Sequence, residues 1–408
     1  MSLTNTRDSY GGIAKTFHWL IALLILTNIP LGLIAQDLAQ SIADPATAPT
    51  EDLVARAALL FSLHKTTGVA IFFVALARIL WALTQPRPAL LNGDARLEAW
   101  LAASVHWLLY GSLVLVPLSG WVHHAATSGY APIWWPFGQG LPLVPKDEGW
   151  AEVSGTLHYI LQWVLIGAIA LHVAGALKHH LIDGDATLRR MLPGGGAARP
   201  TAEQPGHVLP FLTALAVWGA AIGIGLGLGW FAQAERPEGA ALAEAAGDWQ
   251  VTSGTLSITI AQMGSDVTGT FADWTADISY DETADAQGRH GTVEVIVSIP
   301  SLSLGSVSEQ AMGPEYFDAE TWPTARFAAD LVAQEGGLVA DGTLTIRDRS
   351  APLTLPVTLA IEDDTATASG AGSVDRRDFG VGSGTTDAGT LGFDVGIEFD
   401  LTAERQQP

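Results

Sequence analysis

Apolar residues form five long runs in the first 231 residues of the chain, and shorter alternating runs fill the remainder. The five runs cover residues 16–36, 60–88, 100–123, 153–177 and 208–231. Each run reaches the length of about 20 apolar residues that a helix needs to cross roughly 30 Å of hydrocarbon. We therefore predict five transmembrane helices, the first with a tolerated kink near Pro30 and Gly32.

From residue 248 onward, apolar and polar residues alternate in short segments that Gly, Asp and Pro interrupt. Such segments are typical of the strands of a β-sandwich or a β-barrel. Residues 233–408 also contain 29 acidic and 8 basic residues, a net charge of −21, whereas the whole chain carries −22. We expect a nearly neutral part in lipid and an acidic part in water, and the acidic surface argues against a nucleic-acid partner.

Lysine and arginine indicate which loops face the cytoplasm. The N-terminus and the connections after the second and fourth spans hold Arg7, Lys15, Arg78, Arg87, Arg96, Lys178, Arg189 and Arg190. The opposite loops hold only Arg56, Lys65 and Lys146. By the positive-inside rule the N-terminus is cytoplasmic. Five spans then carry the C-terminal part into the periplasm, which predicts a multi-pass protein of the bacterial inner membrane.

Histidines recur at matched depths in these spans. His158 and His172 are fourteen residues apart, nearly four helical turns, so their side chains point the same way about 21 Å apart. In the predicted orientation, His64 shares the outer depth with His158, and His18 shares the inner depth with His172. Ionisable residues within spans are costly and usually functional. We predict two haem irons, each held by one of these histidine pairs.

The chain contains no cysteine, and this decides which haem it can hold. Without thiolate ligands or a C-x-x-C-H attachment, a haem must be b-type, non-covalent and held by His or Met. A single histidine in a span can instead make a polar packing contact, but four residues at two matched depths favour ligands. His106 competes by depth with His18 as the partner of His172, and its other candidate roles are a contact with a propionate, a quinone or a helix.

Three cations lie near the predicted haem depths. Arg78 and Lys15 could neutralise propionates of the inner haem, and Lys65 could do so for the outer haem. Alternatively, all three side chains extend to the membrane interface and only mark the topology.

The segments around the histidines resemble the bacterial cytochrome b561 family over residues 8–194. The matching segments are YGGIAKTFHWLIALLIL, SVHWLLYGSLVLVPLSGW, LHYILQWVLIGAIALHVAGALKHH and GDATLRRMLP. The resemblance implies a four-helix bundle with two b haems, and it gives the axial-ligand role to His18, His64, His158 and His172. Members of the family exchange electrons with quinone, and one activity attributed to it is superoxide oxidation coupled to quinone reduction.

A second resemblance, to the YceI-like family, covers residues 248–404. The matching segments are GPEYFDAETWPTARF, DGTLTIRDRSAPLTLPVTL and DRRDFGVGSG. The family fold is a lipocalin-like antiparallel barrel, and its implied ligand is a long isoprenoid chain such as a polyprenyl lipid or a quinone. A closed barrel of about eight strands can hold one slim apolar ligand. Candidates for its lining, each of which could also be ordinary barrel core, are Phe271, Trp274, Tyr316, Phe317 and Phe327.

The predicted architecture is multi-domain. An all-α transmembrane four-helix di-haem bundle occupies residues 8–194, and a fifth span (208–231) with a linker occupies residues 195–247 as a tether. An all-β lipocalin-like antiparallel barrel follows in residues 248–404. No catalytic residue is identified, because iron with two histidine ligands has no open position and is limited to outer-sphere electron transfer.

The expected function is membrane electron transfer through two b haems that exchange electrons with quinone. Superoxide is a candidate donor on the periplasmic side, and the barrel would bind an isoprenoid quinone there, which makes the chain similar to a superoxide:quinone oxidoreductase. The alternative is a membrane-anchored isoprenoid carrier or stress protein whose haem domain is an anchor or a redox reporter. A third interpretation is a cytochrome subunit of a larger oxidoreductase.

Overall fold

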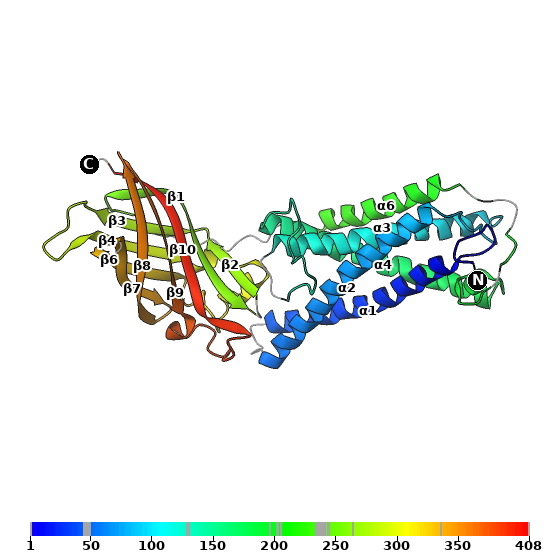
Figure 1. Cartoon of the computed structure of the whole chain (residues 1–408), viewed down its shortest axis with the longest axis horizontal. Helices are drawn as coiled ribbons and strands as arrows, with labels where there is room; N and C mark the ends of the chain where they lie inside the picture. The colour runs from blue at the N-terminus through cyan, green and yellow to red at the C-terminus, as the bar shows by residue number, and fades with distance from the viewer. Residues whose placement is uncertain are drawn as a thin grey trace. The chain divides into compact units, whose positions relative to one another are not determined.

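The computed structural model describes residues 2–406 except 44–49, 128–130, 196, 201–203, 205, 233–241, 243–244, 263–264 and 335–336. The chain forms two units, a helical bundle and a β-barrel (Figure 1). Most of the predicted linker between them lies outside the described residues. The predicted domain boundaries therefore stay predictions.

The five predicted spans are confirmed as helices that are long and apolar enough to cross a membrane. They are α1 (Gly12–Ala43), α2 (Glu51–Leu83), α3 (Arg96–Ala126), α4 (Glu148–Leu181) and α6 (Val208–Gly227), and the short α5 (Thr187–Met191) follows α4. Four of them extend beyond the apolar runs, because helical hydrogen bonding does not stop where the apolar residues end. Pro30 lies inside α1, which continues past it.

The bundle has a narrow apolar core and an apolar outer surface. The core residues come in pairs from α1 to α4: Ile21, Ile25, Ile71, Ala75, Leu113, Val116, Leu161 and Leu165. Large side chains such as Leu23, Leu26 and Leu80 are exposed on the outside of the helices. Exposed apolar surface of this extent is expected where lipid replaces water.

The fifth membrane helix packs against the bundle and does not only tether it. Ala214 of α6 is fully buried against Leu108 of α3 and Ala168 of α4. The Trp218 indole Nε1 donates a hydrogen bond to Ser112 Oγ at 3.3 Å. These contacts fix the position of α6 against α3 and α4.

The barrel is one antiparallel sheet that closes on itself (Figure 1). Its eight strands are β1 (Trp249–Gln262), β3 (Trp274–Tyr280), β4 (Arg289–Ser298), β6 (Thr324–Gln334), β7 (Gly337–Ile346), β8 (Arg349–Glu362), β9 (Thr365–Asp375) and β10 (Leu391–Arg405). β1 pairs with β10 along most of its length and with β3 at Trp249. Closure leaves the barrel without the open edge that a sandwich would have, and it confirms the predicted antiparallel barrel.

Short elements complete one end of the barrel. The second half of β1 pairs with β2 (Ser265–Phe271), which pairs in turn with β5 (Leu302–Ser303). Four helical turns accompany these strands: η1 (Ile299–Ser301), η2 (Gly305–Val307), α7 (Ser308–Met312) and η3 (Arg376–Phe379). Along β8 the inward residues Ala351, Leu353 and Leu355 are buried and alternate with exposed ones. The alternation seen in the sequence is therefore the alternation between barrel interior and solvent.

Candidate haem sites and barrel cavity

His64 on α2 and His158 on α4 face each other inside the bundle. Their ring centroids are 6.3 Å apart, and the ring planes are nearly perpendicular. Two iron–nitrogen bonds of about 2.0 Å, with about 1.1 Å from each ring centre to its Nε2, span roughly 6.2 Å. The separation of the two rings therefore fits one iron between them.

Backbone carbonyl groups orient both rings of this outer pair. His64 Nδ1 lies 3.0 Å from the carbonyl oxygen of Asn28, and His158 Nδ1 lies 2.8 Å from that of Val116. A ring that donates from Nδ1 to a carbonyl keeps its proton there and presents the Nε2 lone pair on its other side. Metal-binding histidines almost always have such a second contact. The two imidazoles are therefore suited to act as ligands of an iron.

Two glycines allow the rings to reach these carbonyls. A Cβ on Gly32 would lie 2.6 Å from Cε1 of His64, and one on Gly120 would lie 2.9 Å from Cε1 of His158. Each glycine stands one helical turn after the carbonyl that its histidine contacts. In the sequence, Gly32 indicates only a kink and Gly120 carries no signal, because neither position shows which histidine will pack against it.

The inner site brings three histidines together. The ring centroids of His18 on α1 and His172 on α4 are 6.0 Å apart, which is again close to the span of a shared iron. The centroid of His106 on α3 is 5.1 Å from that of His172, and His106 Nδ1 lies 2.6 Å from the carbonyl oxygen of Ala102 in its own helix. This spacing is too short for an iron between His106 and His172, so the geometry favours His18.

The three cations singled out in the sequence differ in their surroundings. Arg78 lies over the Tyr110 ring, 5.3 Å from its centroid, and interacts electrostatically with His18 and His172. Lys15 is buried, and its Nζ donates to the carbonyls of Leu192 and Gly195 at 3.0 and 3.1 Å. Lys65 is also buried and does not extend to a surface.

The barrel encloses an apolar cavity of about 220 Å³. Four of the residues predicted to line it do so: Phe271, Trp274, Phe317 and Phe327. The fifth, Tyr316, is not among the lining residues. Its hydroxyl lies 3.4 Å from Gln310 Nε2, its carbonyl accepts from Arg347 Nη1 at 3.2 Å, and burial raises the pKa of its phenol.

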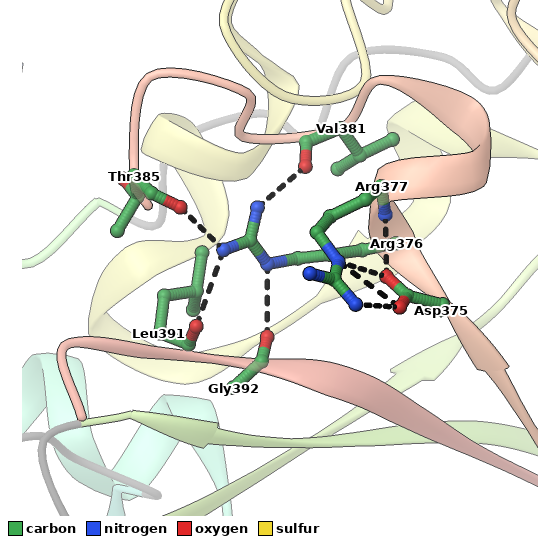
Figure 2. A network of polar contacts seen from close by, with 7 residues as sticks. All are labelled: Asp375, Arg376, Arg377, Val381, Thr385, Leu391 and Gly392. Atoms are coloured by element: carbon green, nitrogen blue, oxygen red, sulfur yellow. Dashed lines mark hydrogen bonds and ion pairs between the residues drawn. The ribbon is translucent and has the colours of Figure 1, made fainter. Parts of the chain in front are cut away.

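A buried arginine reaches the same cavity. Arg376 of η3 is 2 % exposed, and backbone carbonyls accept hydrogen bonds from Nε, Nη1 and Nη2 (Figure 2). These carbonyls belong to Val381, Gly382, Thr385, Leu391 and Gly392, at distances of 2.6–3.2 Å. Since all five N–H groups of a guanidinium are thereby used, Arg376 holds the chain between η3 and β10 in place and leaves no donor for a ligand. In the sequence it was visible only as part of the DRRDFG segment.

The two residues that flank Arg376, Asp375 at the end of β9 and Arg377 in η3, form a separate ion pair at the surface. Arg377 Nε lies 2.9 and 3.0 Å from the two carboxylate oxygens of Asp375, and its guanidinium lies 3.9 Å from the centroid of the Phe393 ring. The hydrogen bonds and charge of Arg377 lower the pKa of Asp375 to about 2. Figure 2 shows the two arginines pointing to different partners.

Comparison with known proteins gives two families for the one chain. Residues 9–194 match the model of prokaryotic cytochrome b561, and residues 249–403 match that of the YceI-like domain. Cytochrome b561 homolog 2 of Escherichia coli (strain K12) is 32% identical over 193 residues, which are 47% of this chain and 95% of that protein. The probable superoxide oxidase CybB of Yersinia pestis is 29% identical over 188 residues, 45% of this chain and 96% of that protein.

Among solved structures, BcnA of Burkholderia cenocepacia is similar to the barrel. It is 29% identical, with a TM-score of 0.34, over 36% of this chain and 95% of BcnA. The two family matches and the Escherichia coli relative lead to one conclusion. The chain belongs to the cytochrome b561 family of membrane electron-transfer proteins, which hold b-type haem, and it joins a YceI-like barrel to that domain.

Proposed function

We propose that the bundle holds two b haems and carries electrons from a periplasmic donor to quinone, and that the barrel holds an isoprenoid chain. The observation that supports this most strongly is the spacing of the two histidine pairs, with centroids 6.3 and 6.0 Å apart. His64 and His158 hold one haem, and His18 and His172 hold the other. When bound, these groups supply one-electron redox chemistry, whose potential the protein sets through ligands, hydrogen bonds and burial.

The paired histidines favour outer-sphere electron transfer. With two histidines as ligands, each iron would have no position left for a donor molecule, so the haems would supply outer-sphere electron transfer. The Nδ1 contacts of His64 and His158 with backbone carbonyls keep both rings in one tautomer, so each Nε2 lone pair would be available to an iron. The exposed apolar outer surface of the helices keeps the pairs inside a membrane, where quinone is dissolved.

Superoxide is the proposed donor, supported by the similarity to a protein named probable superoxide oxidase. Two superoxide ions give up two electrons and become two molecules of O₂. One quinone takes up these two electrons and two protons and becomes quinol. The distribution of Lys and Arg supports a periplasmic position for the donor side and the barrel, in a bacterium with two membranes.

The barrel supports the isoprenoid part of the proposal. Apart from Arg376, whose donors are all used, aliphatic and aromatic side chains line its cavity, and a slim hydrocarbon chain needs no polar partner. The same observation favours the second candidate function, an isoprenoid carrier in which the haem domain is an anchor or a redox reporter. Turnover of superoxide with quinone separates the two, because a carrier binds the isoprenoid without turnover.

The first test is the haem content of the purified chain, measured by pyridine haemochrome with the protein concentration determined in parallel. We expect two haem b per chain, and one haem or none would contradict the proposal. The second test is stopped-flow reduction by superoxide with and without a soluble quinone. A haem spectrum that superoxide reduces but quinone does not reoxidise would remove the quinone part.

A further inference from the structure

Arg190 of α5 is a buried cation with unused hydrogen-bond donors. Its side chain is 4 % exposed, and Nη1 donates to the carbonyl of Ala89 at 2.9 Å. Within the described part of the chain, Nε and Nη2 have no hydrogen-bond partner. A buried charge of this kind is costly unless it is paired, and buried polar atoms without partners are rare. These two nitrogens therefore indicate a partner that the protein itself does not supply.

A second arginine and two tyrosines surround the same place. The Arg190 guanidinium lies over the Tyr10 ring, 5.4 Å from its centroid, as Arg78 lies over Tyr110 at 5.3 Å. Tyr10 interacts electrostatically with Arg190, Tyr110 and Arg78, so the two arginine–tyrosine pairs are neighbours. Burial raises the pKa of Tyr10, and the two arginines act in the opposite direction. The cluster is thus positively charged, with Arg190 buried and the other three residues partly buried.

No carboxylate neutralises the cluster from within. Over the described residues, neither Arg78 nor Arg190 forms an ion pair with Asp or Glu. Lys15, which the sequence suggested as a cation for the propionates of the inner haem, already donates to the carbonyls of Leu192 and Gly195. The free donors belong to Arg190, and a guanidinium fork matches the two oxygens of a carboxylate.

Through Arg78, the cluster lies near the inner histidines. Arg78 interacts electrostatically with His18, His106 and His172. α5 is attached to α1 close to His18, because the Trp19 indole Nε1 donates to the carbonyl of Met191 at 2.8 Å. A haem held by His18 and His172 carries two propionate carboxylates, which need a cationic partner at such a depth.

We propose that Arg190, supported by Arg78, binds the propionates of the haem that His18 and His172 hold. This inference rests on the proposed function and adds a cofactor-binding residue to it. Arg190 neutralises the propionate charge, and the bound propionate in turn supplies the partner that a buried guanidinium needs. Arg189, its neighbour in α5, is exposed and has no part in the site.

The test compares Arg190→Gln with the matched control Arg189→Gln, in the full chain. Redox titration is carried out in a His64→Ala background, which retains only the inner haem, and in a His18→Ala background, which retains only the outer one. Loss of the Arg190 charge favours the oxidised inner haem. A tenfold change in the equilibrium constant between its reduced and oxidised forms corresponds to a fall in midpoint potential of about 59 mV for one electron. We expect this fall for the inner haem only, a smaller fall with Arg190→Lys, and none with Arg189→Gln.

Two results would overturn the inference. One is an inner-haem midpoint in Arg190→Gln equal to that in Arg189→Gln. The other is an equal loss of both haems in Arg190→Gln and Arg190→Lys, which would indicate a structural role for the side chain. The wild-type chain separates this failure from that of the proposed function, because two haems per chain in the wild type leave the proposed function intact whatever Arg190 does.

Discussion

Gly120 of α3 and His158 of α4 are in such close contact that a Cβ on the glycine would lie 2.9 Å from Cε1 of the histidine. The contact allows His158 Nδ1 to lie 2.8 Å from the carbonyl oxygen of Val116, one turn before the glycine. Gly32 and Asn28 stand in the same relation to His64. Both rings of the outer pair are therefore oriented in the same way. A glycine makes room for the ring, and the backbone carbonyl one helical turn earlier contacts its Nδ1.

Gly120→Ala is expected to remove about half of the haem. The new Cβ displaces the His158 ring from the Val116 carbonyl, so Nε2 no longer points at the iron position. The measurement is haem per chain by pyridine haemochrome. Gly167→Ala on α4 is the control, because a Cβ there meets nothing within 4 Å and the change favours the helix by up to about 1 kcal/mol. Equal haem contents in the two variants would show that Gly120 does not position the ring.

The inner site predicts opposite results for His106→Ala and His18→Ala. His106 Nδ1 is bonded within its own helix, and the His106 ring is too close to the His172 ring for a shared iron. We expect His106→Ala to keep two haems per chain and His18→Ala to keep one. Optical spectra and haem content of the two purified variants are the measurement. The reverse pattern would assign the ligand role to His106.

A side chain added to the barrel cavity is expected to weaken isoprenoid binding by about tenfold, or roughly 1.4 kcal/mol. Ala368→Phe on β9 fills part of the cavity that Ala368 lines, whereas Thr367→Phe adds the same ring to the exposed side of the same strand. The measurement is equilibrium binding of a polyprenyl alcohol to the full chain. Equal affinities for the two variants would place the ligand outside the cavity.

Arg376→Gln is expected to destabilise the barrel by about 3 kcal/mol or more. The substitution leaves buried carbonyls between Val381 and Gly392 without donors, and hydrogen bonds to a charged donor contribute about 1.5–3 kcal/mol each. Chemical unfolding followed by far-ultraviolet circular dichroism measures the change. Arg377→Gln is the control, since Arg377 is exposed and pairs with Asp375 at the surface. A loss as large in the control would show that the buried network is not the cause.

The alternation and length of apolar runs determined much of the fold without any knowledge of tertiary contacts. A run of about 20 apolar residues has few stable states other than a membrane helix, because hydrocarbon leaves backbone groups no partner except each other. Alternation over residues 248–404 indicated strands with one apolar face. The five long helices α1 to α4 and α6 lie at the apolar runs, and the eight barrel strands lie in the alternating region. The spacing of His158 and His172 likewise needs only the helical period.

Other features exist only because distant segments meet. The alternating pattern by itself did not distinguish a sandwich from a barrel, since the pairing of β1 with β10 joins residues about 140 positions apart. Only the resemblance of its segments to the YceI-like family predicted the barrel. The sequence also did not show that His64 contacts Gly32, or that α6 packs against α3 and α4. In the sequence Arg189 and Arg190 are two equal cations at the end of a span. Only packing exposes the first and buries the second, because burial depends on which neighbours fold over a side chain and not on the side chain itself.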